Sequence, residues 1–212
     1  MSVEFYYASG SPYAWRVWLA LEYKSATYEQ HVLSFDAGDL ETPTFAKLNP
    51  RQKVPVLKDG KFVLTESSAI VEYVEERWPQ VPRLFSLDVQ QRARQRQLIR
   101  EIDGYIAPAV EHLAEAVIYA PPEQRTEAAI GAAIAALQTE LSRWEKAFGG
   151  EYLAGDPSAA DFTLYPFIEL VQRFAKRVPN TPADLLGPTL TAWAARMTAL
   201  QVVQKTWPPH WK

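Results

Sequence analysis

The chain has 212 residues, which allows one or two domains at about 100–200 residues per domain. Its 22 Lys and Arg against 25 Asp and Glu give a formal net charge of −3, which argues against nucleic acid or anionic membranes as partners. With 0 Cys and 3 His, the sequence excludes disulfides, Cys-ligated metals and a Cys nucleophile, and we expect no metal site. The opening residues lack the basic and apolar regions of a signal peptide, so we expect a cytoplasmic protein.

Strand and helix signals alternate over the first 80 residues. A β-prone run at 3–7 leads into Ser11 and Pro12, which fit the cap and first position of a helix. We expect further strands at 28–33, 54–57 and 62–64 and helices at 42–48 and 66–78. Asp59 and Gly60 between the last two strands predict a hairpin. The order β-α-β-α-β-β-α predicts a small mixed four-stranded sheet with helices packed on it.

The second part of the chain carries helix signals and no convincing strand. A proline-rich break follows Trp78, so we expect one domain at 1–80, a linker at 81–87 and an all-helical bundle at 88–212. Helices are expected at 88–119, at 121–148, from 162 onward and at 188–204, and Pro108 should kink the first of them. Ser158 and Asp161 form a capping-box pattern, which gives Asp161 a structural role.

Three segments of the sequence together resemble the glutathione S-transferase family. They are SPYAWRV at 11–17, LNPRQKVPVL at 48–57 and TESSAI at 65–70, in that order and ahead of a helical half. The likeness is greatest to the serine-type branch of theta, zeta, tau and related bacterial enzymes. It implies a thioredoxin-like domain followed by a helical domain, assembled as a homodimer. It also implies glutathione as cosubstrate, with its thiol attacking a small hydrophobic electrophile.

The resemblance places the catalytic serine at Ser11. A free thiol has a pKa near 8.5, and lowering it by about two units requires roughly 2.7 kcal/mol of preference for the anion. A serine hydroxyl at a helix N-terminus can supply part of that preference. Ser9, Tyr6 and Tyr7 remain alternatives, and the other interpretation of Ser11 is a helix cap without a catalytic role. Arg16, one helical turn on, either raises the positive field near the sulfur or is solvated.

Four further residues are expected to hold glutathione, again through the resemblance. Val54, before a cis proline at 55, would pair with the cysteinyl unit as an added strand does. Ser67 would take the γ-glutamyl carboxylate at a helix N-terminus, and Glu66 would take the ammonium. Lys53 would take the glycyl carboxylate. Each of these residues also has an interpretation that involves no ligand. The proline at 55 would then be trans, Glu66 and Ser67 would cap the helix, and Lys53 would be a solvated loop residue.

Two departures from the family pattern stand out. Related classes often carry a His or Lys where this chain has Asp39, Leu40 and Glu41. The glycyl carboxylate is therefore left to Lys53, with Arg51 or Gln52 as substitutes. Tyr13 occupies the place of a cysteine in the zeta pattern, which argues against a dedicated maleylacetoacetate isomerase. The missing cysteine also excludes the thioltransferase and glutathione-lyase branches.

The helical half is expected to complete the site. Asp103 lies where related enzymes reach into the neighbouring subunit's glutathione site. An apolar pocket for the electrophile would be lined by Tyr13, Tyr105, His112 and Trp211. The function alternatives are a glutathione-dependent peroxidase or isomerase, and a non-catalytic binding module of the same fold.

Overall fold

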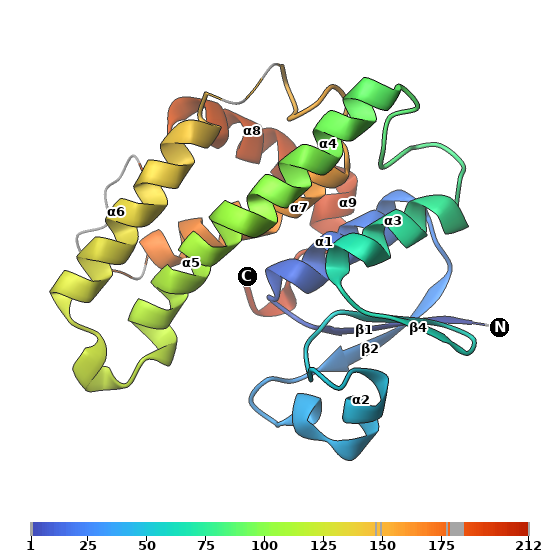
Figure 1. Cartoon of the computed structure of the whole chain (residues 1–212), viewed down its shortest axis with the longest axis horizontal. Helices are drawn as coiled ribbons and strands as arrows, with labels where there is room; N and C mark the ends of the chain where they lie inside the picture. The colour runs from blue at the N-terminus through green and yellow to red at the C-terminus, as the bar shows by residue number, and fades with distance from the viewer. Residues whose placement is uncertain (1, 147, 149, 177, 179–184, 212) are drawn as a thin grey trace. The chain divides into compact units, whose positions relative to one another are not determined.

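The mixed strand and helix signals of the first 80 residues and the helix signals of the rest correspond to two units in the computed structural model (Figure 1). The structure describes residues 2–146, 148, 150–176, 178 and 185–211. Residues up to Ser86, together with those from Leu200 onward, form the first unit, and Leu87–Ala199 form the second. The first unit contains the sheet and the second is helical.

Alternating apolar residues build the sheet of the first unit. Val3, Phe5 and Tyr7 are buried on one face of the first strand, while Glu4 and Tyr6 on the other face are half-buried. The first strand pairs parallel with the second and antiparallel with the third, which pairs antiparallel with the fourth. The predicted mixed four-stranded sheet is therefore confirmed. Its order is β2-β1-β3-β4, with β1 at Val3–Ala8, β2 at Tyr28–Leu33, β3 at Val56–Asp59 and β4 at Phe62–Leu64.

Helices cover the sheet as the sequence predicts. The two longer ones lie side by side over one face of the sheet, and α2 lies beyond the other (Figure 1). The first helix begins with Pro12 after the cap residue Ser11, and it buries Val17, Ala20 and Leu21. The helices of this unit are α1 (Pro12–Tyr23), η1 (Asp39–Glu41), α2 (Pro43–Leu48), α3 (Ser67–Arg77), α9 (Gln201–Lys205) and η5 (Pro209–Trp211).

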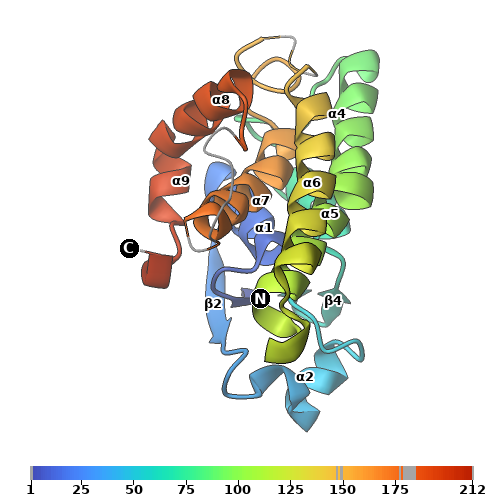
Figure 2. The same cartoon turned by 90° about the vertical axis from the view of Figure 1, so that its left-hand side faces the viewer.

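The second unit packs around one apolar helix, α7. Most residues of α7 are buried, and the predicted capping box of Ser158 and Asp161 begins it. The helix α6 returns alongside the long α4–α5 segment (Figure 2). The elements are α4 (Val89–Glu101), η2 (Ile102–Ile106), α5 (Ala107–Ala114), η3 (Glu115–Tyr119), η4 (Pro122–Gln124), α6 (Glu127–Trp144), α7 (Ala159–Ala175) and α8 (Pro188–Ala199).

Pro108, which was expected to kink its helix, lies near the start of α5 in a helix that continues through it. A π-helical turn, η2, precedes it, and the Ala107 N–H donates to the carbonyl of Ile102, five residues back. Proline lacks an N–H and clashes with the carbonyl four residues before it, so the wider turn accommodates its ring within a continuing helix. The next predicted helix also differs, since it begins at Glu127 after the cap Thr126. Residues 147 and 149 at its expected end lie outside the described residues.

The predicted domain boundaries differ from the units of the structure at two places. Residues 81–86, expected as a linker, belong to the first unit, where Leu84 and Phe85 are buried. Residues from Leu200 onward, expected in the helical domain, also belong to the first unit. They are held there by α1, because the Trp15 indole N–H donates to the Thr206 hydroxyl at 2.9 Å.

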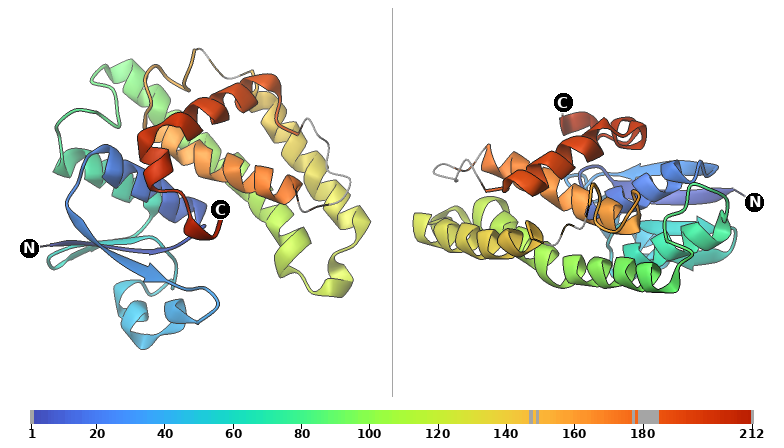
Figure 3. Two further views of the ribbon diagram at one scale, coloured as in Figure 1. Left: turned by 180° about the vertical axis from the view of Figure 1, so that it is seen from behind. Right: turned by 90° about the horizontal axis from the view of Figure 1, so that it is seen from above.

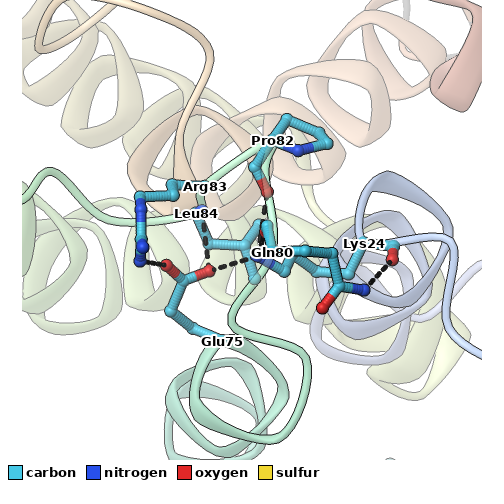
Figure 4. A network of polar contacts seen from close by, with 6 residues as sticks. All are labelled: Lys24, Glu75, Gln80, Pro82, Arg83 and Leu84. Atoms are coloured by element: carbon cyan, nitrogen blue, oxygen red, sulfur yellow. Dashed lines mark hydrogen bonds and ion pairs between the residues drawn. The ribbon is translucent and has the colours of Figure 1, made fainter.

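A buried lysine ties the segment after α3 to the first unit (Figure 4). The Lys24 side chain is fully buried, and its Nζ lies 2.9 Å from the Glu75 carboxylate. Nζ also donates to the carbonyls of Gln80 and of Pro82, the latter at 2.9 Å. The same carboxylate accepts from the Leu84 N–H at 3.0 Å. One ion pair thus organises residues 80–84.

No helix in the described ranges is both long enough and apolar enough to cross a membrane. Over the same ranges, no three His, Cys, Asp or Glu side chains gather as metal ligands would.

Candidate functional site

The three segments noted in the sequence meet at one edge of the sheet. Tyr6 of β1 pairs with Val56 of β3, so the chain just before β3 lies beside the end of β1. Leu64 of β4 pairs with Leu57, which brings the chain after β4 to the same edge. The antiparallel register therefore brings together the turn after β1, the Val54–Pro55 peptide bond and the start of α3. All three belong to the first unit.

A tight turn presents Ser11 at this edge. The Ser11 N–H donates to the Ala8 carbonyl at 3.2 Å, and Gly10 has φ of +89°. A four-residue turn with positive φ at its third position is type II, which requires glycine there. The Ser11 hydroxyl accepts from the Ala14 N–H at 3.3 Å as the cap of α1. Since it accepts a hydrogen bond from the helix, the hydroxyl keeps its own proton to donate to another group.

The other candidates for the thiolate ligand, Tyr6, Tyr7 and Ser9, each have a hydroxyl that is hydrogen-bonded to another side chain. The Tyr6 hydroxyl donates to the Glu4 carboxylate at 2.5 Å, and burial together with that hydrogen bond raises the pKa of Tyr6 to about 12. The Tyr7 hydroxyl donates to Gln30 at 3.1 Å, and burial raises the pKa of Tyr7. The Ser9 hydroxyl lies 3.2 Å from Nδ1 of His210. The two tyrosine hydroxyls thus donate their protons to Glu4 and Gln30, whereas the Ser11 hydroxyl accepts from Ala14 and keeps its own. The Ser9 hydroxyl donates to or accepts from His210 according to the tautomer of the imidazole.

The loop before β3 carries Lys53 and is held by a buried asparagine. The Val54–Pro55 peptide bond is cis, as the resemblance implies. The Asn49 amide donates to the Lys53 carbonyl at 2.6 Å and accepts from the Arg51 N–H at 3.0 Å. The Lys53 side chain is exposed. The role of Asn49 was not predicted, although its place before a proline marks it as a turn residue.

The start of α3 combines a strained residue with a buried one. Glu66 is exposed and has φ of +66°, a conformation that a residue with a side chain rarely adopts and that costs on the order of 1–3 kcal/mol. Ser67, the first residue of α3, is buried. Such strain persists where the surroundings enforce it, and it concentrates at ligand sites.

Arg16 is buried rather than solvated, and it binds Ser67. Its Nε donates to the Ser67 hydroxyl at 2.8 Å, and its guanidinium lies 5.2 Å from the centre of the Tyr13 ring. The hydroxyl of Ser67 therefore accepts from Arg16 and keeps its own proton to donate to an anion. The contact of Arg16 with Ser67 was not predicted, since the two residues lie 51 positions apart in the sequence.

The acidic segment that replaces the family's basic residue forms the short helix η1. The Asp39 carboxylate accepts from the Ser34 N–H at 2.9 Å, so it shapes its own loop. Arg51 and Gln52, the proposed substitutes, are both exposed on the loop before β3.

The four residues expected to line one pocket divide between the units. Tyr13 is half-buried beneath Arg16, and Trp211 packs edge-on against Trp15, both within the first unit. Tyr105 and His112 belong to the second unit, where His112 is exposed on α5. Asp103 is half-buried in the π-helical turn η2.

Tyr105 borders a pocket of about 190 Å³ in the second unit. The pocket is lined by Glu101, Tyr105, Glu140, Arg143 and Trp144. Arg143 pairs with Glu140 at 2.8 Å, so an ion pair and the rings of Tyr105 and Trp144 line it together. At about 190 Å³, this pocket is smaller than the small-molecule sites of most proteins, which measure about 300–1,000 Å³.

Comparison with known proteins covers nearly the whole chain. Residues 10–77 match the family model for the glutathione S-transferase N-terminal domain. Glutathione S-transferase U13 of Arabidopsis thaliana is 31% identical over 93% of this chain and 87% of its own length. Maleylacetoacetate isomerase of Mus musculus is 32% identical over 92% of this chain and 87% of its own length.

A solved structure extends the similarity to three dimensions. It is a glutathione transferase from Pseudomonas putida with one glutathione disulfide bound per protein subunit. It matches with a TM-score of 0.84 at 25% identity, over 97% of this chain and 90% of the other. The likeness thus spans both units.

Proposed function

The chain belongs to the glutathione S-transferase family, and on that premise we propose that the sheet edge of its first unit binds glutathione and activates the thiol as thiolate. The thiol proton leaves to solvent, a carbon–sulfur bond forms with a small hydrophobic electrophile, and the leaving group departs. Conjugation of this kind serves detoxification, and we propose the cytoplasm as its location. No metal takes part in this scheme.

The observation that carries the proposal is the position of Ser11. Its hydroxyl lies at the N-terminus of α1 and accepts from the Ala14 N–H, so its proton can be donated to sulfur. A hydrogen bond to a charged acceptor contributes about 1.5–3 kcal/mol, and a helix N-terminus adds about 0.3–1 kcal/mol for an anion. Together these reach the roughly 2.7 kcal/mol that a two-unit fall in thiol pKa requires.

The remainder of glutathione would bind along the same edge. We propose that Ser67 donates to the γ-glutamyl carboxylate, supported by the Arg16 charge behind it, and that Glu66 takes the ammonium. Val54 would pair through its backbone with the cysteinyl unit, in the manner of an added strand. Lys53, exposed on the Asn49-held loop, would take the glycyl carboxylate.

We further propose that the protein is a homodimer. Asp103 is half-buried in η2 and would reach the glutathione of the partner subunit. Sedimentation of the purified protein tests the assembly, and a monomer at micromolar concentration would contradict it.

Ser11→Ala is expected to lower the rate of glutathione conjugation tenfold or more with the fold unchanged. The loss corresponds to about 1.4 kcal/mol of barrier, close to one hydrogen bond to a charged group. The measurement is steady-state kinetics with 1-chloro-2,4-dinitrobenzene as probe, with circular dichroism to check the fold.

Tyr6→Phe and Tyr7→Phe are the matched controls, because each removes a hydroxyl near the same strand end. Both should stay within about twofold of the unaltered protein, since their hydroxyls donate to Glu4 and Gln30. An unaffected rate in Ser11→Ala, with a fall in one of the tyrosine variants, would reject Ser11 as the thiolate ligand.

A second candidate function is glutathione-dependent isomerisation, favoured by the 32% identity to a maleylacetoacetate isomerase. The thiolate would then add to the substrate and leave again, so glutathione is not consumed. Tyr13 stands where the zeta pattern has a cysteine, which argues against isomerisation as the main activity. Following glutathione concentration during turnover of maleylacetoacetate separates isomerisation from conjugation, and formation of glutathione disulfide with an organic hydroperoxide identifies peroxidase activity.

A further inference from the structure

The C-terminal tail, residues 206–211, is anchored firmly to α1. Thr206 is fully buried and accepts from the Trp15 indole N–H at 2.9 Å. Trp207 and Trp211 both pack edge-on against the Trp15 ring, with centroids 5.6 and 5.4 Å away. The Trp211 N–H donates to the Pro208 carbonyl at 2.9 Å, which closes the tail on itself. Three aromatic rings and two hydrogen bonds therefore fix where the tail lies.

The end of the tail meets the turn at residues 8–11, which presents Ser11. The view from behind shows the C-terminus beside the start of α1 (Figure 3, left). Nδ1 of His210 lies 3.2 Å from the Ser9 hydroxyl. A Cβ built on Gly10 would lie 3.1 Å from Nε2 of His210 and 3.3 Å from Nε1 of Trp211. The tail thus contacts Ser9 and occupies the space that a side chain at position 10 would need.

We propose that His210 is a positioning residue that holds the turn, and through it the Ser11 hydroxyl, in its working orientation. This inference rests on the proposed function of Ser11. Within the turn, the described backbone hydrogen bond runs from Ser11 to Ala8 at 3.2 Å, near the long end of the usual range. The pairing of His210 with Ser9 adds a second attachment from a segment 201 residues away in sequence.

The first test measures the turn itself, without any need for activity. Amide hydrogen exchange is followed by mass spectrometry on the peptide that contains residues 8–11. His210→Ala should raise the exchange of this peptide about fivefold, since one lost hydrogen bond shifts a local opening equilibrium by that factor. His210→Asn, which keeps a polar atom near the place of Nδ1, should restore most of the protection. Gln204→Ala, an exposed change on α9, is the matched control and should leave it unchanged.

The second test asks whether the turn governs catalysis. His210→Ala should lower kcat about fivefold while KM for glutathione stays within twofold, because the residues proposed to bind glutathione are untouched. Ser9→Ala should have a similar effect. The double variant should be no slower than either single variant, as expected when two residues act as one pair.

The outcomes separate this inference from the proposed function. Unchanged exchange in His210→Ala, or additive losses near 25-fold in the double variant, would overturn the inference while leaving Ser11 as the thiolate ligand. If the unaltered protein conjugates no electrophile, the proposed function fails, and the role of His210 in catalysis fails with it.

Discussion

Asp161→Ala is expected to lower the free energy of unfolding by about 3–5 kcal/mol. The Asp161 carboxylate is fully buried and accepts four hydrogen bonds, from the Leu153 N–H, the Ser158 N–H, the Ser158 hydroxyl and the Trp193 indole, at 2.9–3.0 Å. Alanine would leave these four donors without an acceptor inside the second unit. An unsatisfied buried donor costs about 1–3 kcal/mol, so several together account for the loss.

Urea denaturation followed by circular dichroism measures the change. The matched control is Asp156→Ala, because Asp156 is an exposed acid five residues earlier, and its loss should stay within about 0.5 kcal/mol. A cost below 1 kcal/mol for Asp161→Ala would show that the capping box does not stabilise the second unit.

Lys24→Met is expected to destabilise the protein by about 3 kcal/mol. The methionine fills a similar volume but leaves the carbonyls of Gln80 and Pro82 without their shared donor. The Glu75 carboxylate loses its buried cation, although it keeps the Leu84 N–H and the Arg83 guanidinium. Breaking one side of a buried ion pair typically costs 3–5 kcal/mol, and the partners that remain place this case at the lower end.

Thermal unfolding of Lys24→Met, compared with Lys47→Met on the exposed surface of α2, isolates the effect of burial. The double variant Lys24→Met with Glu75→Gln should recover part of the loss, because it removes the uncompensated charge. Equal melting temperatures for the two lysine variants would contradict the structural role of the network.

Features that depend on neighbouring residues could be predicted from the sequence. The cap at Ser11, the hairpin at Gly60 and the capping box at Asp161 each rest on hydrogen bonds that span at most a few residues. The mixed four-stranded sheet followed from the alternation of apolar residues together with the family resemblance, whereas the order of its strands, β2-β1-β3-β4, was not predicted. For these features, the structure that neighbouring residues favour is the one that the fold adopts.

Features that depend on distant parts of the chain escaped prediction. The sequence leaves open whether Arg16 lies near the sulfur or in solvent, and only the structure shows that α3 brings Ser67 against it. Lys24 is buried only because residues 80–84 fold back over it. The tail reads as part of the helical half, but its contacts with Trp15 and Ser9 lie within the first unit. Periodicity along one segment carries no information about such long-range pairs.

Calorimetric titration near pH 7.5 tests whether the sheet edge of the first unit holds a thiolate-stabilising glutathione site. The purified protein is titrated with glutathione and, separately, with S-methylglutathione. We predict binding at micromolar to low-millimolar concentration, tighter for the thiol than for the thioether, with the difference reduced in Ser11→Ala. Absence of binding for both compounds would contradict the account and would favour a non-catalytic module of the same fold.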